Sequence, residues 1–101
     1  SGTTATGPDG AARHPGDTYA QTKAALERAI EAVKALGGRT DDIIRSRLYL
    51  APAADWSEAG RAHKDVLGQV APANTTLYVG SLIGEDFLVE AELEAELTPP
   101  A

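Results

Sequence analysis

The chain has 101 residues, a net charge of −6 and no cysteine. This length suits one core rather than two, so residues 1–101 are expected to form a single domain. The acidic balance, with an isoelectric point near 4.7, argues against binding to nucleic acid or to an anionic membrane. Disulfides and thiolate chemistry are excluded, and the sequence contains neither a signal-peptide core nor a membrane-spanning apolar run. A cytoplasmic location is therefore expected.

The first half of the chain predicts a strand, a long helix and a second strand. Small and β-branched residues at Ser1–Ala5 are typical of a strand end, and a Gly- and Pro-rich loop follows. Asp17 predicts the N-cap of a helix that runs to Leu36, because its apolar residues recur at spacings of three, four or seven. Apolar and polar residues then alternate over 44–50, which predicts a strand with Ile44 on its inward side.

A second helix and a third strand are predicted next. Asp55 is expected to cap the helix, and His63 falls on its apolar face. That position favours a hydrogen-bonded structural histidine over a catalytic one. Thr75–Gly80 then predicts a strand with Leu77 and Val79 inward.

The last predicted strand, Phe87–Leu97, alternates most regularly. Its outward side carries a row of glutamates, and a row of like charges weakens a strand unless it is neutralised. If this strand neighbours the second one, Arg45 and Arg47 are expected to pair with Glu92 and Glu94. One straight strand does not supply the converging oxygens that a cation needs, so no metal site is predicted. The final residues, Thr98–Ala101, are expected to form a tail.

Four segments, taken in order, resemble the Rid family of reactive intermediate deaminases, also called the YjgF family. They are Ser1–Thr3, Asp55–His63, Pro72–Val79 and Leu88–Glu92. The resemblance implies an α+β, chorismate-mutase-like fold with two helices on one face of a mixed sheet, which agrees with the predicted element order. It also implies a homotrimer with a central barrel, ligand clefts between subunits and chemistry without a cofactor. Family members have a further N-terminal strand, which is expected to be missing here.

The resemblance also assigns roles to individual residues. Glu90 corresponds to a glutamate that orients or activates the attacking water, and is predicted to be catalytic. The alternative is that Glu90 accepts backbone hydrogen bonds and fixes a loop. The backbone of Gly2 is expected to lie along the cleft, because glycine permits close approach of a ligand. The remaining predicted ligand-binding residues are Gly60, Asn74, Thr76 and Tyr78.

Asn74 takes the place of an arginine that clamps the substrate carboxylate in deaminating members. A neutral amide cannot replace that charge, and no Lys or Arg follows Lys64 in the sequence. Two functions are therefore considered. The protein hydrolyses an imine, an enamine or a related reactive metabolite, without being an ordinary 2-imino-acid deaminase. Alternatively, it is a non-catalytic trimer that binds a small metabolite or a protein. RNA cleavage is disfavoured by the acidic charge.

Overall fold

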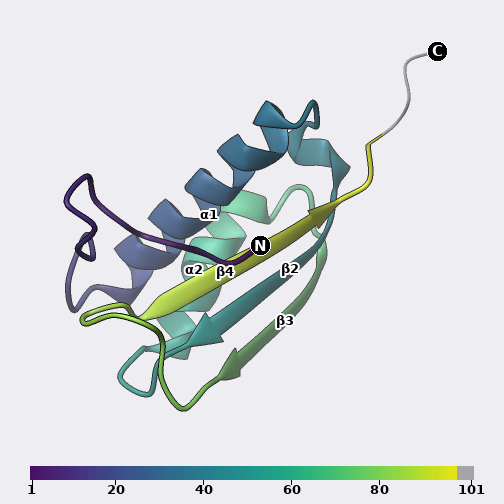
Figure 1. Cartoon of the computed structure of the whole chain (residues 1–101). Coiled ribbons are helices and arrows are strands. Elements are labelled where there is room, and N and C mark those ends of the chain that lie inside the picture. Colours follow the sequence, from purple (N-terminus) through teal and green to yellow (C-terminus); the bar gives the residue numbers. More distant parts are fainter. Residues whose placement is uncertain (98–101) are drawn as a thin grey trace.

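The computed structural model describes residues 1–97 as a four-stranded sheet with two helices on one side (Figure 1). The predicted tail at 98–101 lies outside the described residues. The mixed sheet and its two covering helices confirm the predicted α+β architecture. In chain order the elements are β1 (Thr3–Thr4), α1 (Thr18–Ala35), a short 3-10 turn (Thr40–Asp42), β2 (Ile43–Leu50), α2 (Trp56–Leu67), β3 (Ala73–Tyr78) and β4 (Val89–Ala95).

The strands lie in the order β1-β4-β2-β3. β4 is antiparallel to both of its neighbours, whereas β2 and β3 are parallel because α2 forms the crossover between them. Tyr49 of the central strand β2 lies opposite Glu90 of β4 and opposite Leu77 of β3. These three residues therefore share one face of the sheet, which is the face that the helices leave uncovered.

Both helices begin at the predicted residues. The Asp17 side chain accepts a hydrogen bond from the Ala20 amide at 3.0 Å, and Asp55 accepts one from the Ser57 amide at 3.0 Å. The Ser57 hydroxyl and the nearby amides hold the pKa of Asp55 below its ordinary value, because they stabilise the carboxylate. α1 has 18 residues and is therefore about 27 Å long, enough to cross the whole sheet.

The core lies between the helices and the sheet. Its large, fully buried apolar side chains come from both helices and from the two central strands: Leu26, Leu48, Leu50, Leu67 and Val89. Within residues 1–97, neither helix is both long and apolar enough to cross a membrane.

Three predicted inward positions are wrong: Ile44, Leu77, and Val79, which follows the end of β3 on the same face as Leu77. Ile44 is 50% exposed because the ladder between β2 and β4 is irregular between Ile43 and Arg45, so that Ile43 enters the core instead. Leu77 is 41% exposed because it lies on the uncovered face of the edge strand β3. The apolar residue pattern was read correctly as extended structure, but it did not indicate which face the helices cover.

Gln21 is a fully buried polar residue that the sequence analysis did not single out. Its side-chain amide donates to the Asp86 carbonyl at 2.7 Å and accepts from the Leu88 amide at 2.8 Å. It also donates to the His14 carbonyl at 3.3 Å. Gln21 therefore ties α1 to the loop that leads into β4.

Candidate functional site

Gly2 and Glu90 come together beside the β1–β4 pair. Thr4 lies opposite Glu90 in the ladder, and the Glu90 side chain reaches over the backbone of Gly2. A Cβ atom at Gly2 would overlap the Glu90 carboxylate, so a larger residue there would have to displace the Glu90 side chain. The structure brings these two predicted site residues together, and their roles remain a prediction.

A shallow hollow of about 380 Å³ lies next to Glu90 on the uncovered face of the sheet. Val79 and the loop residues Leu82 and Ile83 supply its apolar surface. Its polar groups come from β2, β4 and the same loop: Tyr49, Ser81, Glu90 and Glu92. The hollow therefore combines an aliphatic surface with two carboxylates.

Tyr49 is a member of this hollow that sequence reasoning missed. Its hydroxyl donates a hydrogen bond to Glu92. This bond, with smaller contributions from burial and from the Glu92 charge, raises the pKa of Tyr49 above its ordinary value. The tyrosine therefore stays protonated and acts as a donor. Its position on the polar side of the predicted strand was the available signal.

The expected ion pairs across β2 and β4 form only in part. Arg47 binds Glu94 at 2.5 Å, as predicted. Glu92 instead accepts from Tyr49, and Arg45 donates to Thr75 at 3.5 Å. Arg47 thus pairs with Glu94. Glu90 and Glu92, which line the hollow, have no cationic partner among residues 1–97.

Asn74 and Thr76 lie on the opposite face of the sheet from Glu90. They align with Ser46 and Leu48 of β2, whose side chains are buried under the helices. The Asn74 amide nitrogen donates to Ser46 Oγ at 3.0 Å, and the Thr76 hydroxyl donates to Asn74 Oδ1 at 2.8 Å. Both residues are exposed at the edge of the sheet.

His63 extends this network into the protein. Its Nε2 lies 2.7 Å from the hydroxyl of the fully buried Ser46. Burial lowers the pKa of His63 below its ordinary value, because the charged imidazolium is poorly solvated there. The predicted hydrogen bond of His63 is confirmed, and its structural role remains a prediction.

We expect a measurable pH dependence from His63. The unfolded chain protonates this histidine near pH 6.5, whereas the folded chain does so only at lower pH. The stability that the neutral side chain contributes is thus fully present above about pH 6.5 and is lost as the pH falls through the folded pKa. In urea unfolding, His63→Gln should lose less stability than the wild type between about pH 7 and pH 5. Parallel losses in the two proteins would contradict this, and His14→Gln, at an exposed histidine, is the control.

Tyr78 and Gly60 complete the predicted set. The Tyr78 hydroxyl donates to the Ala54 carbonyl at 2.8 Å, which ties the end of β3 to the segment before α2. Gly60 is exposed on α2, and a Cβ atom there would meet open space. The predicted site residues thus form two groups: Gly2 and Glu90 on the uncovered face, and Asn74, Thr76 and Tyr78 on the helix-covered side of β3.

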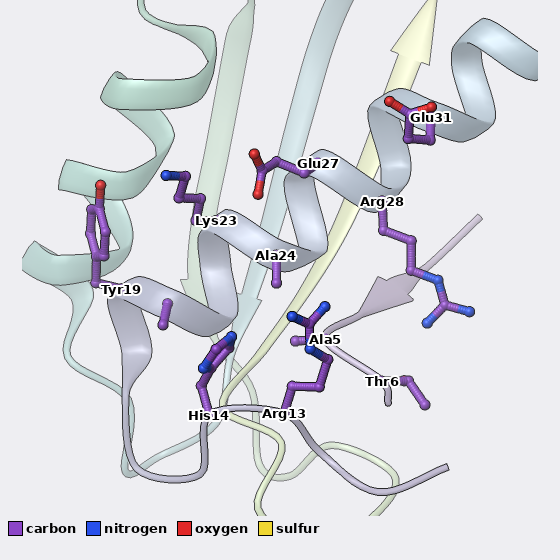
Figure 2. Close-up of a pocket in the computed structure, with 11 residues that line it drawn as sticks. Ala5, Thr6, Arg13, His14, Tyr19, Lys23, Ala24, Glu27, Arg28 and Glu31 are labelled. Atoms are coloured by element: carbon purple, nitrogen blue, oxygen red, sulfur yellow. The ribbon is translucent and has the colours of Figure 1, made fainter. Parts of the chain in front are cut away.

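A separate hollow of about 480 Å³ lies between the N-terminal segment and α1 (Figure 2). Arg13 and His14 from the loop approach Ala24 on the helix, while Lys23 and Glu27 project from α1 toward solvent. None of the predicted site residues lines it. Cations and carboxylates are mixed there on exposed side chains, as on a solvated helix face. Within residues 1–97, no three His, Asp or Glu side chains converge to hold a metal ion.

Comparison with known proteins identifies the family. The profile described as Endoribonuclease L-PSP matches residues 1–97. An uncharacterised protein of Streptomyces coelicolor is 41% identical over 80 residues, which cover 79% of this chain and 60% of that protein, so the chain spans less than two thirds of that relative. A crystal structure of a YjgF/YER057c/UK114-family member from Mycobacterium tuberculosis superposes with a TM-score of 0.82, at 32% identity, over 96% of this chain and 75% of that one. Escherichia coli TdcF with bound serine shares the fold, with a TM-score of 0.83 at 22% identity, over 97% and 78% of the respective chains. The chain belongs to the YjgF/L-PSP family, which is the Rid family that its motifs resemble.

Proposed function

We propose that this protein forms a homotrimer with small-molecule clefts between subunits, and that Glu90 promotes hydrolysis of an imine, an enamine or a related reactive metabolite there. One observation carries the proposal. The Glu90 carboxylate lies over the Gly2 backbone and lines a hollow that has an apolar surface. A carboxylate in this position has a neighbouring space for a ligand and a backbone that approaches it closely.

The division of the predicted residues between two faces supports a cleft that two subunits share. Asn74 and Glu90 cannot line one cleft in a single subunit, because they lie on opposite faces of the same sheet. In an assembly, the β3 edge of one subunit can face the uncovered sheet of the next. The exposed Leu77 and the uncovered sheet face offer surface for such an assembly. The solved structure of TdcF with serine supports a small-molecule ligand in this fold.

The proposed chemistry needs only water and a base. Glu90 accepts a proton from water as the oxygen attacks the imine carbon and the C=N electrons move to nitrogen. The proton then passes to that nitrogen and gives a carbinolamine. As its C–N bond breaks, the hydroxyl proton moves to the leaving nitrogen, and a carbonyl compound and ammonia are released. This hydrolysis requires no cofactor.

Two measurements test the proposal together. Sedimentation equilibrium is expected to give about three times the subunit mass of 10.5 kDa. Imines generated in situ by oxidases, with 2-iminobutyrate among them, should include at least one that the protein hydrolyses faster than buffer does. A monomer at all concentrations, or a trimer with no effect on any imine, would contradict the hydrolase.

The second candidate function is a non-catalytic trimer that binds a metabolite or a protein. Asn74, in the place of the carboxylate-binding arginine, favours it over an ordinary 2-imino-acid deaminase. Ligand binding by a trimer without any hydrolysis would select this function. RNA cleavage is not proposed, because a chain with net charge −6 attracts polyanions poorly.

A further inference from the structure

The hydrogen bonds of Asn74 fix the orientation of its side-chain amide. The Asn74 nitrogen lies 3.0 Å from Ser46 Oγ and 3.4 Å from the Ser46 carbonyl oxygen. A carbonyl oxygen only accepts, so the amide atom beside it must be the NH₂ group. The NH₂ group therefore faces Ser46. The remaining acceptor capacity lies on Asn74 Oδ1, which the Thr76 hydroxyl already contacts from one side at 2.8 Å.

Ser46 and His63 hold this orientation from inside the protein. His63 Nε2 lies 2.7 Å from Ser46 Oγ, and burial favours the neutral imidazole. In the tautomer with its proton on Nδ1, Nε2 accepts the Ser46 hydroxyl hydrogen. The Ser46 oxygen is then free to accept from the Asn74 NH₂ group. Each group in the chain from His63 to Thr76 therefore has one consistent role, and turning the Asn74 amide over would place two acceptors against each other.

The hollow beside Glu90 also presents hydrogen-bond acceptors, like the Asn74 oxygen. Glu90 and Glu92 are its charged groups, and no lysine or arginine among residues 1–97 lines it. Arg47, the nearest cation on this face, is bound to Glu94. Val79, Leu82 and Ile83 add apolar surface. A ligand that suits these walls donates hydrogen bonds, carries positive charge and has an apolar substituent.

We propose that Ser46 and His63 are positioning residues that keep the Asn74 oxygen toward the ligand, so that the site selects cationic, donor-bearing imines or amines that lack a carboxylate. This inference rests on the proposed cleft, in which Asn74 of one subunit faces Glu90 of the next. An iminium ion fits, because its N–H groups are donors and its charge complements the carboxylates. Its hydrolysis balances: R₂C=NH₂⁺ and water give R₂C=O and NH₄⁺, with the new C–O bond replacing the C–N bond.

A matched pair of substrates tests the selection. An L-amino-acid oxidase converts leucine to an imine with a carboxylate, and a flavin-dependent amine oxidase converts isopentylamine to the same imine skeleton without it. We expect the protein to hydrolyse the uncarboxylated imine at least about tenfold faster, relative to the uncatalysed rates. Faster hydrolysis of the carboxylated imine would overturn the inference while leaving the proposed hydrolase intact.

Three variants separate positioning from structure. Asn74→Arg should reverse the preference, whereas Gln69→Arg adds the same charge at an exposed position outside the hollow and should not. Ser46→Ala removes the hydroxyl that holds the Asn74 amide. It should therefore reduce the ratio of the rates for the uncarboxylated and carboxylated imines, an effect that loss of stability alone does not produce. An unchanged ratio in both Asn74→Arg and Ser46→Ala would overturn the role of these residues. Circular dichroism checks that each variant is folded.

Direct binding distinguishes the two proposals if no imine is hydrolysed. Calorimetric titration with isopentylamine and with 4-methylpentanoate compares an ammonium and a carboxylate on similar apolar groups. Tighter binding of the amine, by about tenfold or more, would support the selection and reject the hydrolase. Equal or tighter binding of the acid would overturn the selection, and binding of neither would overturn both.

Discussion

Replacing Glu90 with Gln is expected to slow hydrolysis of the best imine substrate by about 10²- to 10⁴-fold, the usual contribution of a positioned general base. Glutamine keeps the shape of the side chain but cannot take a proton from water. The Gly2 backbone would still fit beneath it, since the substitution adds no bulk. The rate is measured at substrate saturation with the imine generated in situ.

Glu94→Gln is the matched control for this experiment. Glu94 lies on the same strand face as Glu90 but pairs with Arg47 and does not line the hollow. It should retain most of the wild-type rate. If both variants lose activity equally, the loss reflects the charge of the strand rather than a base at position 90.

The variant Glu90→Gln also separates the two roles considered for Glu90, which are a general base and a residue that fixes a loop. Within residues 1–97, no backbone amide donates a hydrogen bond to its carboxylate, so a loop-fixing role has no contact to act through. The free energy of unfolding of Glu90→Gln should therefore lie within about 0.5 kcal/mol of the wild type. A larger loss of stability with unchanged activity would restore the structural role.

The second large effect is expected at Gln21. Gln21→Met keeps a similar volume but removes the partners of the Leu88 amide and the Asp86 carbonyl. A buried polar group left without a partner costs about 1–3 kcal/mol, so the variant should lose about 2–4 kcal/mol of unfolding free energy. Urea denaturation measures the loss, and Gln69→Met at an exposed position should cost less than about 0.5 kcal/mol. A loss at Gln21 no larger than that of the control would mean that the loop is held by other contacts.

Local signals predicted most of the fold. Asp17 and Asp55 were recognisable as helix caps because the capping hydrogen bond joins residues two or three apart. The regular alternation of β4 depends only on its own sequence. Ile44 and Leu77 were placed on the wrong side because a bulge and the covered face of a sheet depend on distant partners. Gln21 was missed because a glutamine in a helix reads as a surface residue.

Individual candidate residues can be named from the sequence, but their spatial arrangement cannot. Glu90, Gly2 and Asn74 were named from motifs that each span a few residues. Their separation onto two faces follows from the order β1-β4-β2-β3, which sets neighbours that are far apart in the chain. Ser46 is a polar residue on the otherwise apolar, helix-facing side of β2. Its link to His63 and Asn74 needed the three-dimensional arrangement.

Successive side chains of the central strand β2 point to opposite faces of the sheet, so β2 contacts both groups of site residues. Ser46 points to the helices and holds Asn74, whereas Arg47 and Tyr49 point the other way and engage Glu94 and Glu92. The separation between the two groups within a subunit is therefore set by the thickness of one rigid pleated layer rather than by flexible loops. Any variation in ligand size must then be accommodated by how adjoining copies dock or by residues 79–83, which contribute the part of the hollow that lies outside the regular strands.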